Sequence, residues 1–465
     1  MLSFPELASI TTTAIKDAKD NGNRLFEDDE KHTVERKWTS NSRRYFDNMI
    51  RNSSLHGVSY IADERFSIRR FVWLLVTLAA FFYSATKVYE STVRYLSYPV
   101  STSVRRKYVD KLIFPAVSFC NLNDMRLGMM NGTMIDRAVL NNNLIANVTH
   151  EDWIYREKAA HRLDEMLVEC VFDGRPCSNK NFTTFPLEDD KCFTFNSGKF
   201  DHETAYVSGA GVERSLMVTI NIQHYDYYRD RTEAGIILLL HGQDETPIRV
   251  QRLHISPGFA TYIEIDKKKM INLRPPYNSS CGFIKLKYFT KYSMDSCWIE
   301  QLTSYIVRKC ACKAPFMPGH APNCDGKQAE TCMWPKWEKF KMEKLAKCPL
   351  PCEVDEFKWK SVSRTLFPSP AYANYLKLIL GKKNLMKKQL EKTQDLTKLM
   401  RDNFVRFFIY YNDMSFEFQE QKPSYDLHAF LGDIGGQVGL FVGAGVMSYF
   451  EIIDGLIMML YAQFY

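Results

Sequence analysis

Three acids and a run of glycines interrupt the last apolar stretch of the chain, where charge and bare backbone are both costly. Asp433, Glu451 and Asp454 lie within residues 427–465. Acids inside a membrane span usually face water or a polar interior. Asp433 and Glu451 are 18 residues apart, which is five helical turns, so they share a face with Asp454 if the helix is unbroken. The pattern favours a cation-attracting pore lining; for Asp433 alone, a helix cap is the alternative.

The glycines in the same stretch indicate a second chemistry. Gly435, Gly439 and Gly443 recur every fourth residue, which suits close packing of helices. In residues 443–445, the tripeptide Gly-Ala-Gly can leave helical geometry and turn its carbonyls toward a central axis. Bare backbone at membrane depth is tolerated where it is buried or lines a water path. We therefore expect Gly443, Ala444 and Gly445 to form a carbonyl selectivity filter.

A second apolar stretch, residues 71–86, contains no charged residue. It is shorter than the ~20 residues that cross a bilayer, but Lys87 can snorkel and residues 88–89 extend it. A buried helix of a soluble protein is the alternative. Residues 1–68 are too polar to be a signal peptide. The chain is thus expected to be a membrane protein with two transmembrane helices.

All 12 cysteines lie between the two apolar stretches. An even number in one interval indicates disulfides in an oxidising compartment. Zinc held by Cys310, Cys312, Cys324 and Cys332 is the alternative, and four N-x-S/T acceptors in the same interval oppose it. We expect glycans on these acceptors, Asn131, Asn147, Asn181 and Asn278, and none on Asn52, which precedes the first span.

This topology divides the chain into five segments. They are a cytoplasmic N-terminus (1–68), transmembrane helix 1 (69–90), an extracellular domain (91–426), transmembrane helix 2 with the pore (427–460), and a cytoplasmic end (461–465) whose shortness a truncation would explain.

The expected extracellular domain mixes helix and strand patterns. Apolar runs predict strands at 235–241, 249–255, 261–265, 404–411 and 416–418, and residues 371–403 predict one long basic amphipathic helix. Its lysines indicate a solvated face or, alternatively, a surface for an acidic ligand. Met414 and Ser415 fall between the last two strands, so we expect them to act as a gating linker to the second span. The fold class is α+β, with a large disulfide-rich extracellular domain.

Composition excludes several other classes. The net charge of +7 comes from 61 basic and 54 acidic residues that are interleaved, which is no nucleic-acid footprint. There is no G-x-S-x-G, H-E-x-x-H or P-loop motif, so we expect neither an enzyme nor a cofactor. A two-span receptor or adhesion protein would explain the cysteines and acceptors, but not the acids and glycines of the last span.

The chain resembles the degenerin/epithelial sodium channel superfamily, near its acid-sensing and peptide-gated members. The resemblance runs from His56 onward. The segments that carry it are 55–57 (LHG), 114–123 (FPAVSFCNLN), 192–198 (CFTFNSG), 310–324 (CACKAPFMPGHAPNC) and 432–445 (GDIGGQVGLFVGAG).

The resemblance implies a sodium-permeable trimer around one pore, built of identical or related subunits in the plasma membrane. Both termini would be cytoplasmic, and amiloride-type compounds would block the pore. It implies the pairs Cys120–Cys192, Cys170–Cys177, Cys281–Cys352, Cys297–Cys348, Cys310–Cys332 and Cys312–Cys324. Acid-sensing members have one more bridge, whose positions are Gln301 and Ala346 here.

The resemblance also implies roles for single residues. His56 and Gly57 match a cytoplasmic gating dipeptide, and Tyr98 and Tyr277 match an aromatic pair at the wrist. Gly432 matches a gate position, and the pore set also includes Gly436. The selectivity filter of the family is usually Gly-Ala-Ser. Gly445 lacks the serine hydroxyl, so the resemblance does not determine whether sodium is selected over potassium or calcium.

The stimulus is expected to be an extracellular neuropeptide or similar small ligand. Pro99 and Val100 occupy positions where acid-sensing relatives carry histidines, and Arg105 and Arg106 replace nearby acids. Acid-sensing relatives also have a pair of acidic residues in a pocket; here Trp334 replaces one of them, and Glu338 retains the other. A proton-gated or constitutively open sodium channel is the alternative.

Overall fold

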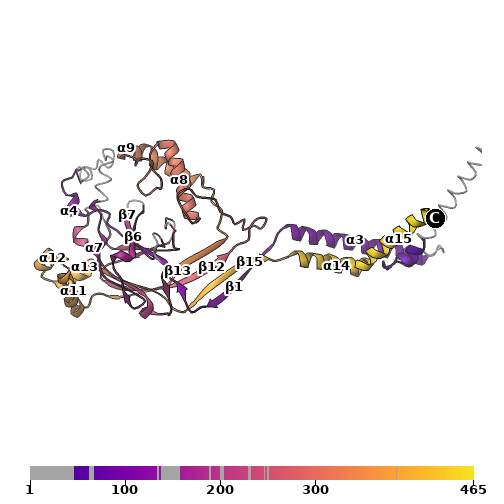
Figure 1. Ribbon diagram of the computed structural model, residues 1–465, viewed down its shortest axis with the longest axis horizontal. Helices are drawn as coiled ribbons and strands as arrows, with labels where there is room; N and C mark the ends of the chain where they lie inside the picture. Colours follow the sequence, from indigo (N-terminus) through magenta and orange to yellow (C-terminus); the bar gives the residue numbers. More distant parts are fainter. Residues whose placement is uncertain are drawn as a thin grey trace, which may run out of the picture. The chain divides into compact units, whose positions relative to one another are not determined.

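The computed structural model describes residues 47–61, 68–133, 136–137, 158–187, 190–198, 204–228, 232–245, 247–248, 251–383 and 385–464. It divides the chain into two compact units. Unit 1 consists of Met1–Val100 with Pro423–Tyr465, and unit 2 consists of Ser101–Lys422. Figure 1 labels some of their elements, among them α3 and α14 of unit 1 and β12 and β13 of unit 2.

Unit 1 is helical. Its elements include α2 (Val58–Ile61), α3 (Ile68–Leu96), α14 (Leu427–Val442) and α15 (Val446–Phe464). α3 has 29 residues, so it is about 44 Å long, which exceeds the ~30 Å of a hydrocarbon core. Phe71, Phe81 and Phe82 on it are exposed. Within the described residues, α3 is the single helix that is long and apolar enough to cross a membrane alone.

The second apolar stretch is not one straight helix. α14 and α15 are long and apolar enough to cross a membrane only when they are taken together. The chain is bent by 66° at the break between them. Asp433 and Glu451 would share a face in an unbroken helix, and this condition is not met because they lie on the two different helices α14 and α15.

Unit 2 is built on β-sheets. An eight-stranded sheet has the order β1-β15-β12-β14-β9-β4-β5, with β13 also paired to β12; a five-stranded sheet has the order β11-β10-β3-β7-β6, and β2 pairs with β8. The strands are β1 (Val100–Tyr108), β2 (Leu112–Ile113), β3 (Ala116–Asn121), β4 (Leu167–Phe172), β5 (Arg175–Pro176), β6 (Phe182–Leu187), β7 (Asp190–Phe195), β8 (Tyr206–Val207), β9 (Leu216–Asn221), β10 (Ile236–His241), β11 (Arg252–Ile255), β12 (Phe259–Ile271), β13 (Glu353–Leu366), β14 (Phe404–Tyr411) and β15 (Ser415–Pro423).

The strand predictions hold where apolar runs are long. β10 and β14 match residues 235–241 and 404–411, and the predicted strands at 261–265 and 416–418 lie inside the longer β12 and β15. β11 begins at Arg252, while residues 249–250 lie outside the described part. All six residues of β10 are buried because both faces of the strand are covered. Ile236, Leu238 and Leu240 pack in one hydrophobic cluster, and Ile237 and Leu239 pack in another.

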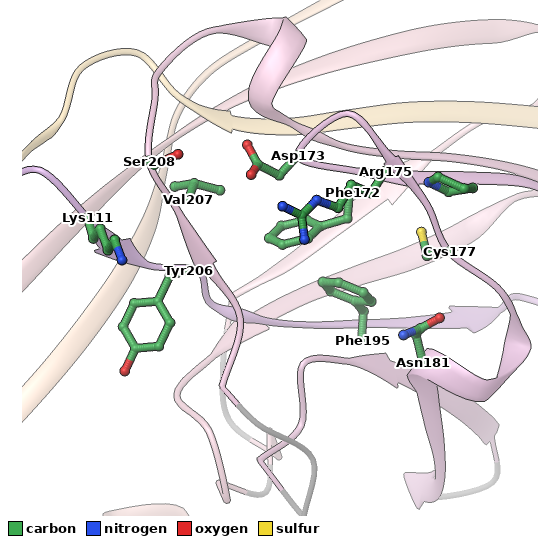
Figure 2. A pocket seen from close by; sticks show the side chains of 11 residues that line it. Lys111, Phe172, Asp173, Arg175, Cys177, Asn181, Phe195, Tyr206, Val207 and Ser208 are labelled. Carbon is green, nitrogen blue, oxygen red and sulfur yellow. The ribbon is translucent and has the colours of Figure 1, made fainter.

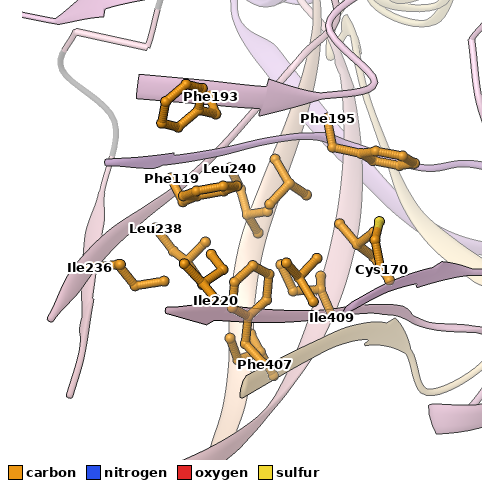
Figure 3. Close-up of a cluster of buried hydrophobic side chains, with 14 of the residues drawn as sticks. Phe119, Cys170, Phe193, Phe195, Ile220, Ile236, Leu238, Leu240, Phe407 and Ile409 are labelled. Carbon is orange, nitrogen blue, oxygen red and sulfur yellow. The ribbon is translucent and has the colours of Figure 1, made fainter. Parts of the chain in front are cut away.

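The main core lies between the two large sheets. Phe119 and Leu238 come from the five-stranded sheet, and Ile220, Phe407 and Ile409 come from the eight-stranded one. Figure 3 shows these side chains gathered in one cluster. Fully burying each such side chain contributes about 1.5–3 kcal/mol, so this cluster holds the sheets together.

The described helices of unit 2 fall into two groups, apart from the short α4 (Leu127–Met130) and α7 (Leu163–Met166). One group contains α8 (Met294–Cys310), α9 (Gly326–Gln328), the π-helical turn η4 (Ala329–Met333) and α10 (Trp334–Met342). The other contains α11 (Pro370–Lys382), α12 (Lys387–Lys392) and α13 (Leu396–Asn403). Single-turn 3-10 helices are η1 (Asn179–Asn181), η2 (Val212–Arg214) and η3 (His224–Asp226).

The prediction of one long helix over residues 371–403 is wrong. Met386 adopts a left-handed conformation with φ 56°, and the Asp395 carboxylate accepts a hydrogen bond from the N–H of Lys398, which starts a new helix. Leu380, Met386 and Met400 are buried in one cluster. The apolar residues of this segment therefore face each other across three short helices.

The six disulfides all lie in unit 2, and they join the same pairs that the family resemblance implies. Cys120–Cys192 joins the neighbouring strands β3 and β7. Cys310 and Cys312 are bonded to Cys332 and Cys324, so these four sulfurs are not thiolates available to zinc.

Candidate functional site

The break between α14 and α15 covers the three residues for which the sequence predicts a departure from helical geometry. α14 begins at a cap, where the Asp426 carboxylate accepts from the N–H of Ala429 at 2.8 Å. It ends at Val442, because Gly443 is left-handed with φ 75° and its N–H reaches back to Gly439 O at 3.0 Å. Glycine occupies this conformation without the steric cost that a side chain brings.

The His-Gly dipeptide contacts this break. The N–H of His56 donates to the carbonyl of Val442 at 2.9 Å, which satisfies an acceptor that a helix end leaves open. A Cβ on Gly443 would lie 2.8 Å from Cδ2 of His56. Gly57 has φ 82°, and a Cβ there would collide with the Thr77 hydroxyl on α3. The dipeptide thus fits closely between α3 and the break.

Ser448 closes the break through its hydroxyl group. Its Oγ accepts from the N–H of Gly445 at 3.2 Å and donates to the carbonyl of Gly443 at 3.3 Å. It also lies 2.6 Å from the hydroxyl of Ser54, and Ser448 is only 4% exposed. Sequence reasoning missed both serines. A hydroxyl residue one helical turn after the glycines was the available signal.

The three acids of the last span have different surroundings. Asp433 lies inside α14 and accepts a hydrogen bond of 2.5 Å from the hydroxyl of Tyr425, so it is not the cap of that helix. Glu451 accepts from the N–H of Ser54 at 3.1 Å. Glu451 and Asp454 line a hollow of about 450 Å³ whose walls include Met49 and Ile452.

Aromatic contacts hold α14 against α3. The rings of Tyr95 and Phe430 stack with centroids 4.6 Å apart, and Tyr83 meets Phe441 edge-on at 4.8 Å. Figure 1 shows the two helices side by side. A Cβ added to Gly432 or Gly436 would have no heavy atom within 4 Å, so nothing in the described part of the chain covers these two glycines.

Most of the other predicted site residues belong to unit 2. Tyr98 belongs to unit 1 and Tyr277 to unit 2. Met414 accepts from the N–H of Val109 at 2.9 Å, and Ser415 is the buried first residue of β15. Among the predicted glycan acceptors, Asn131, Asn181 and Asn278 are exposed, and Asn147 lies outside the described residues.

Carboxylates in unit 2 are paired with cations in many places. Arg105 and Arg106 bind Glu420 and Asp413 at 3.1 and 3.3 Å. The Lys360 ammonium, 2.6 Å from Glu264, lowers the pKa of that carboxyl by its hydrogen bond, and Lys269 lowers the pKa of Glu353 in the same way.

A buried histidine also has a shifted pKa. Burial lowers the pKa of His161, which is 3% exposed. Its Nδ1 donates to the Gln223 carbonyl oxygen at 2.6 Å, and its Nε2 accepts from the Asn123 amide at 2.7 Å. Both ring nitrogens are therefore satisfied in the neutral form.

Where acid-sensing relatives are expected to have one more disulfide, this chain has a polar contact. The Gln301 side-chain amide donates to the carbonyl of Lys347 at 3.2 Å and accepts from its N–H at 3.0 Å. The neighbouring Ala346 packs on the cluster that contains Cys312 and Trp337.

Comparison with known proteins identifies the family. The model of the family "Amiloride-sensitive sodium channel" matches residues 49–454. The chain is 32% identical over 450 residues to acid-sensing ion channel 1C of Danio rerio, covering 87% of this chain and 82% of that one. It is 30% identical to acid-sensing ion channel 1B of the same organism, covering 87% and 75%.

A third relative has a different stimulus in its name. The bile acid-sensitive ion channel of Homo sapiens is 28% identical, with coverage of 87% of this chain and 84% of that one. The family is one of ion channels, not of enzymes, and its members act in the plasma membrane without a cofactor. The chain therefore belongs to the amiloride-sensitive sodium channel family, within the degenerin/epithelial sodium channel superfamily.

Proposed function

We propose that the chain is one subunit of a trimeric, sodium-permeable channel with two membrane spans per subunit and both termini in the cytoplasm. The spans are α3 and the broken pair α14–α15. Ions pass the carbonyls of Gly443, Ala444 and Gly445, and an extracellular peptide or similar small ligand opens the pore.

The break is the observation that carries this proposal. Non-helical backbone at membrane depth must be buried in protein or line a water path. Gly445 is exposed in the described chain, while Gly443 is braced by His56 and Ser448. A braced but uncovered turn of backbone, with Glu451 on the next helix, suits a ring of carbonyls around a cation.

The paired carboxylates favour a ligand over protons as the stimulus. A strong proton sensor needs groups that titrate near neutrality, usually because like charges are forced together. Here Glu264 and Glu353 have pKa values lowered by lysines, so mild acid leaves both ionised. A peptide or another small ligand then has to supply the free energy of opening.

Proton gating is the second candidate, because two relatives are named acid-sensing channels. One recording separates the two. The chain is expressed alone in oocytes, and acid steps, a neuropeptide panel and amiloride are applied while sodium is exchanged for potassium and calcium. We expect amiloride-blocked sodium current with a peptide and little with acid. Large acid currents with no peptide response would reverse the assignment.

A further inference from the structure

A pocket of about 650 Å³ opens on unit 2 between the β4–β5 hairpin and the β2–β8 ribbon. Its apolar lining includes Phe172, Phe195 and Val207, and the last two are buried. Lys111, Arg175 and Tyr206 also line it and are exposed. Figure 2 shows Lys111 and Tyr206 on one side of the pocket and Phe195 and Asn181 on the other.

The walls of this pocket are held in place by covalent and backbone links. Cys170–Cys177 closes the β4–β5 hairpin, and the rings of Phe172 and Phe195 meet with centroids 5.0 Å apart. Backbone pairing of Ile113 with Tyr206 fixes the opposite wall. A preformed pocket of this kind loses little conformational entropy when it binds a ligand.

The charge of the pocket is unbalanced toward positive. The one acid in its lining, Asp173, is paired with Arg214 at 3.2 Å. The side chains of Lys111 and Arg175 form no hydrogen bond or ion pair with the residues that the structure describes. The positive charges of Lys111 and Arg175, next to the aromatic side chains of the lining, are therefore available to a negatively charged group of a bound ligand.

We propose that this pocket binds a short extracellular peptide through a free carboxylate and an aromatic side chain. The planar guanidinium of Arg175 suits bidentate contact with a carboxylate, and Lys111 adds a second positive charge. The aromatic side chain packs on Phe172 and Tyr206. The inference rests on the proposed opening by a peptide, and it adds the site and the required chemistry.

Two matched probes test the chemistry: N-acetyl-Gly-Gly-Phe with a free carboxylate, and the same peptide as its C-terminal amide. Binding to the purified full-length channel is measured by calorimetry after enzymatic removal of N-glycans, because the expected glycan acceptor Asn181 lines the pocket, and current is recorded in parallel. We expect the carboxylate form to bind at least about tenfold more tightly than the amide, the ratio that one good charged contact supplies.

The variants assign this preference to side chains. Arg175→Gln and Lys111→Gln each reduce the carboxylate preference, and the double variant removes it. Tyr206→Ala weakens both probes alike. Lys341→Gln, which removes an exposed charge from α10 outside the lining, changes neither.

The outcomes separate the site from the gating. Binding with these preferences but without current supports the pocket and contradicts opening by these peptides. Peptide-evoked current that is unchanged in the double variant contradicts the pocket and leaves peptide gating standing. Absence of binding by both probes, or a carboxylate preference that persists in the double variant, overturns the inference.

Discussion

The N–H of His56 donates a hydrogen bond of 2.9 Å to the carbonyl of Val442, the last residue of α14. This contact joins the N-terminal segment to the end of the helix where the candidate filter begins. His56 and Gly57 contribute in different ways. The backbone N–H of His56 binds Val442, and its side chain covers Gly443. Gly57 lacks a Cβ, which would collide with the Thr77 hydroxyl.

Gly443→Ala should disturb the break. Its φ of 75° costs a side chain about 1–2 kcal/mol, and the new Cβ would press on His56. We expect altered sodium-to-potassium selectivity or loss of current with normal surface expression. Gly381→Ala is the control, because nothing lies within 4 Å of its added Cβ, its φ is not positive and it lies on α11, outside the candidate filter. Equal effects of both changes would contradict the role of the His56 contact.

Ser448→Ala should weaken the same break through lost hydrogen bonds. The Gly445 N–H, the Gly443 carbonyl and the Ser54 hydroxyl lose a partner, at about 0.5–1.5 kcal/mol for each bond. Reversal potentials under sodium and potassium measure the change in selectivity. Ser448→Thr keeps the hydroxyl and should retain most of the wild-type selectivity. A threonine variant as impaired as the alanine variant would point to volume, not hydrogen bonding.

Gln301→Ala should loosen the helical region around α8 and α10. Both hydrogen bonds to Lys347 are lost, so we expect a stability loss of about 1–3 kcal/mol and a lower melting temperature of the purified chain. Gln301→Glu keeps the acceptor for the Lys347 N–H, so its melting temperature should lie between those of the wild type and Gln301→Ala. An unchanged melting temperature in Gln301→Ala would show that the disulfide cluster alone holds this region.

Acid should weaken unit 2 through His161. Its pKa is lowered in the fold, so the unfolded chain binds the proton more readily, and stability falls as pH drops below the ordinary value near 6.5. For one such group, the free energy of unfolding changes by at most about 1.4 kcal/mol per pH unit. Arg126, Glu165 and Asp226 also act on this ring.

Melting curves at pH 7.5 and 5.5 measure this effect. The wild type should lose melting temperature between them, and His161→Gln, which cannot titrate, should lose less. A variant whose melting temperature falls as steeply as that of the wild type would place the acid sensitivity elsewhere.

Local signals in the sequence predicted a large part of the fold. The apolar runs of β10 and β14 and the tripeptide at the α14–α15 break each depend on residues close in sequence. The disulfide pairing followed from family resemblance instead, because twelve cysteines alone permit a very large number of pairings.

Contacts between distant segments were not predictable in the same way. Nothing in the sequence ties Ser54 to Ser448 or Gln301 to the backbone of Lys347, because these contacts exist only once the helices are packed. The helix over residues 371–403 failed for a related reason. Leu380 and Met400 gain more from packing together than one straight helix allows, so Met386 adopts a left-handed turn.

Thiol modification of Gly445→Cys tests the central claim, that ions pass residues 443–445. All 12 native cysteines are in disulfides, so the introduced thiol is the single reactive sulfur. A cationic methanethiosulfonate reagent, applied to the open channel, should abolish the unitary current in single-channel recordings. An unchanged unitary current after complete modification, verified by mass spectrometry, would contradict the account.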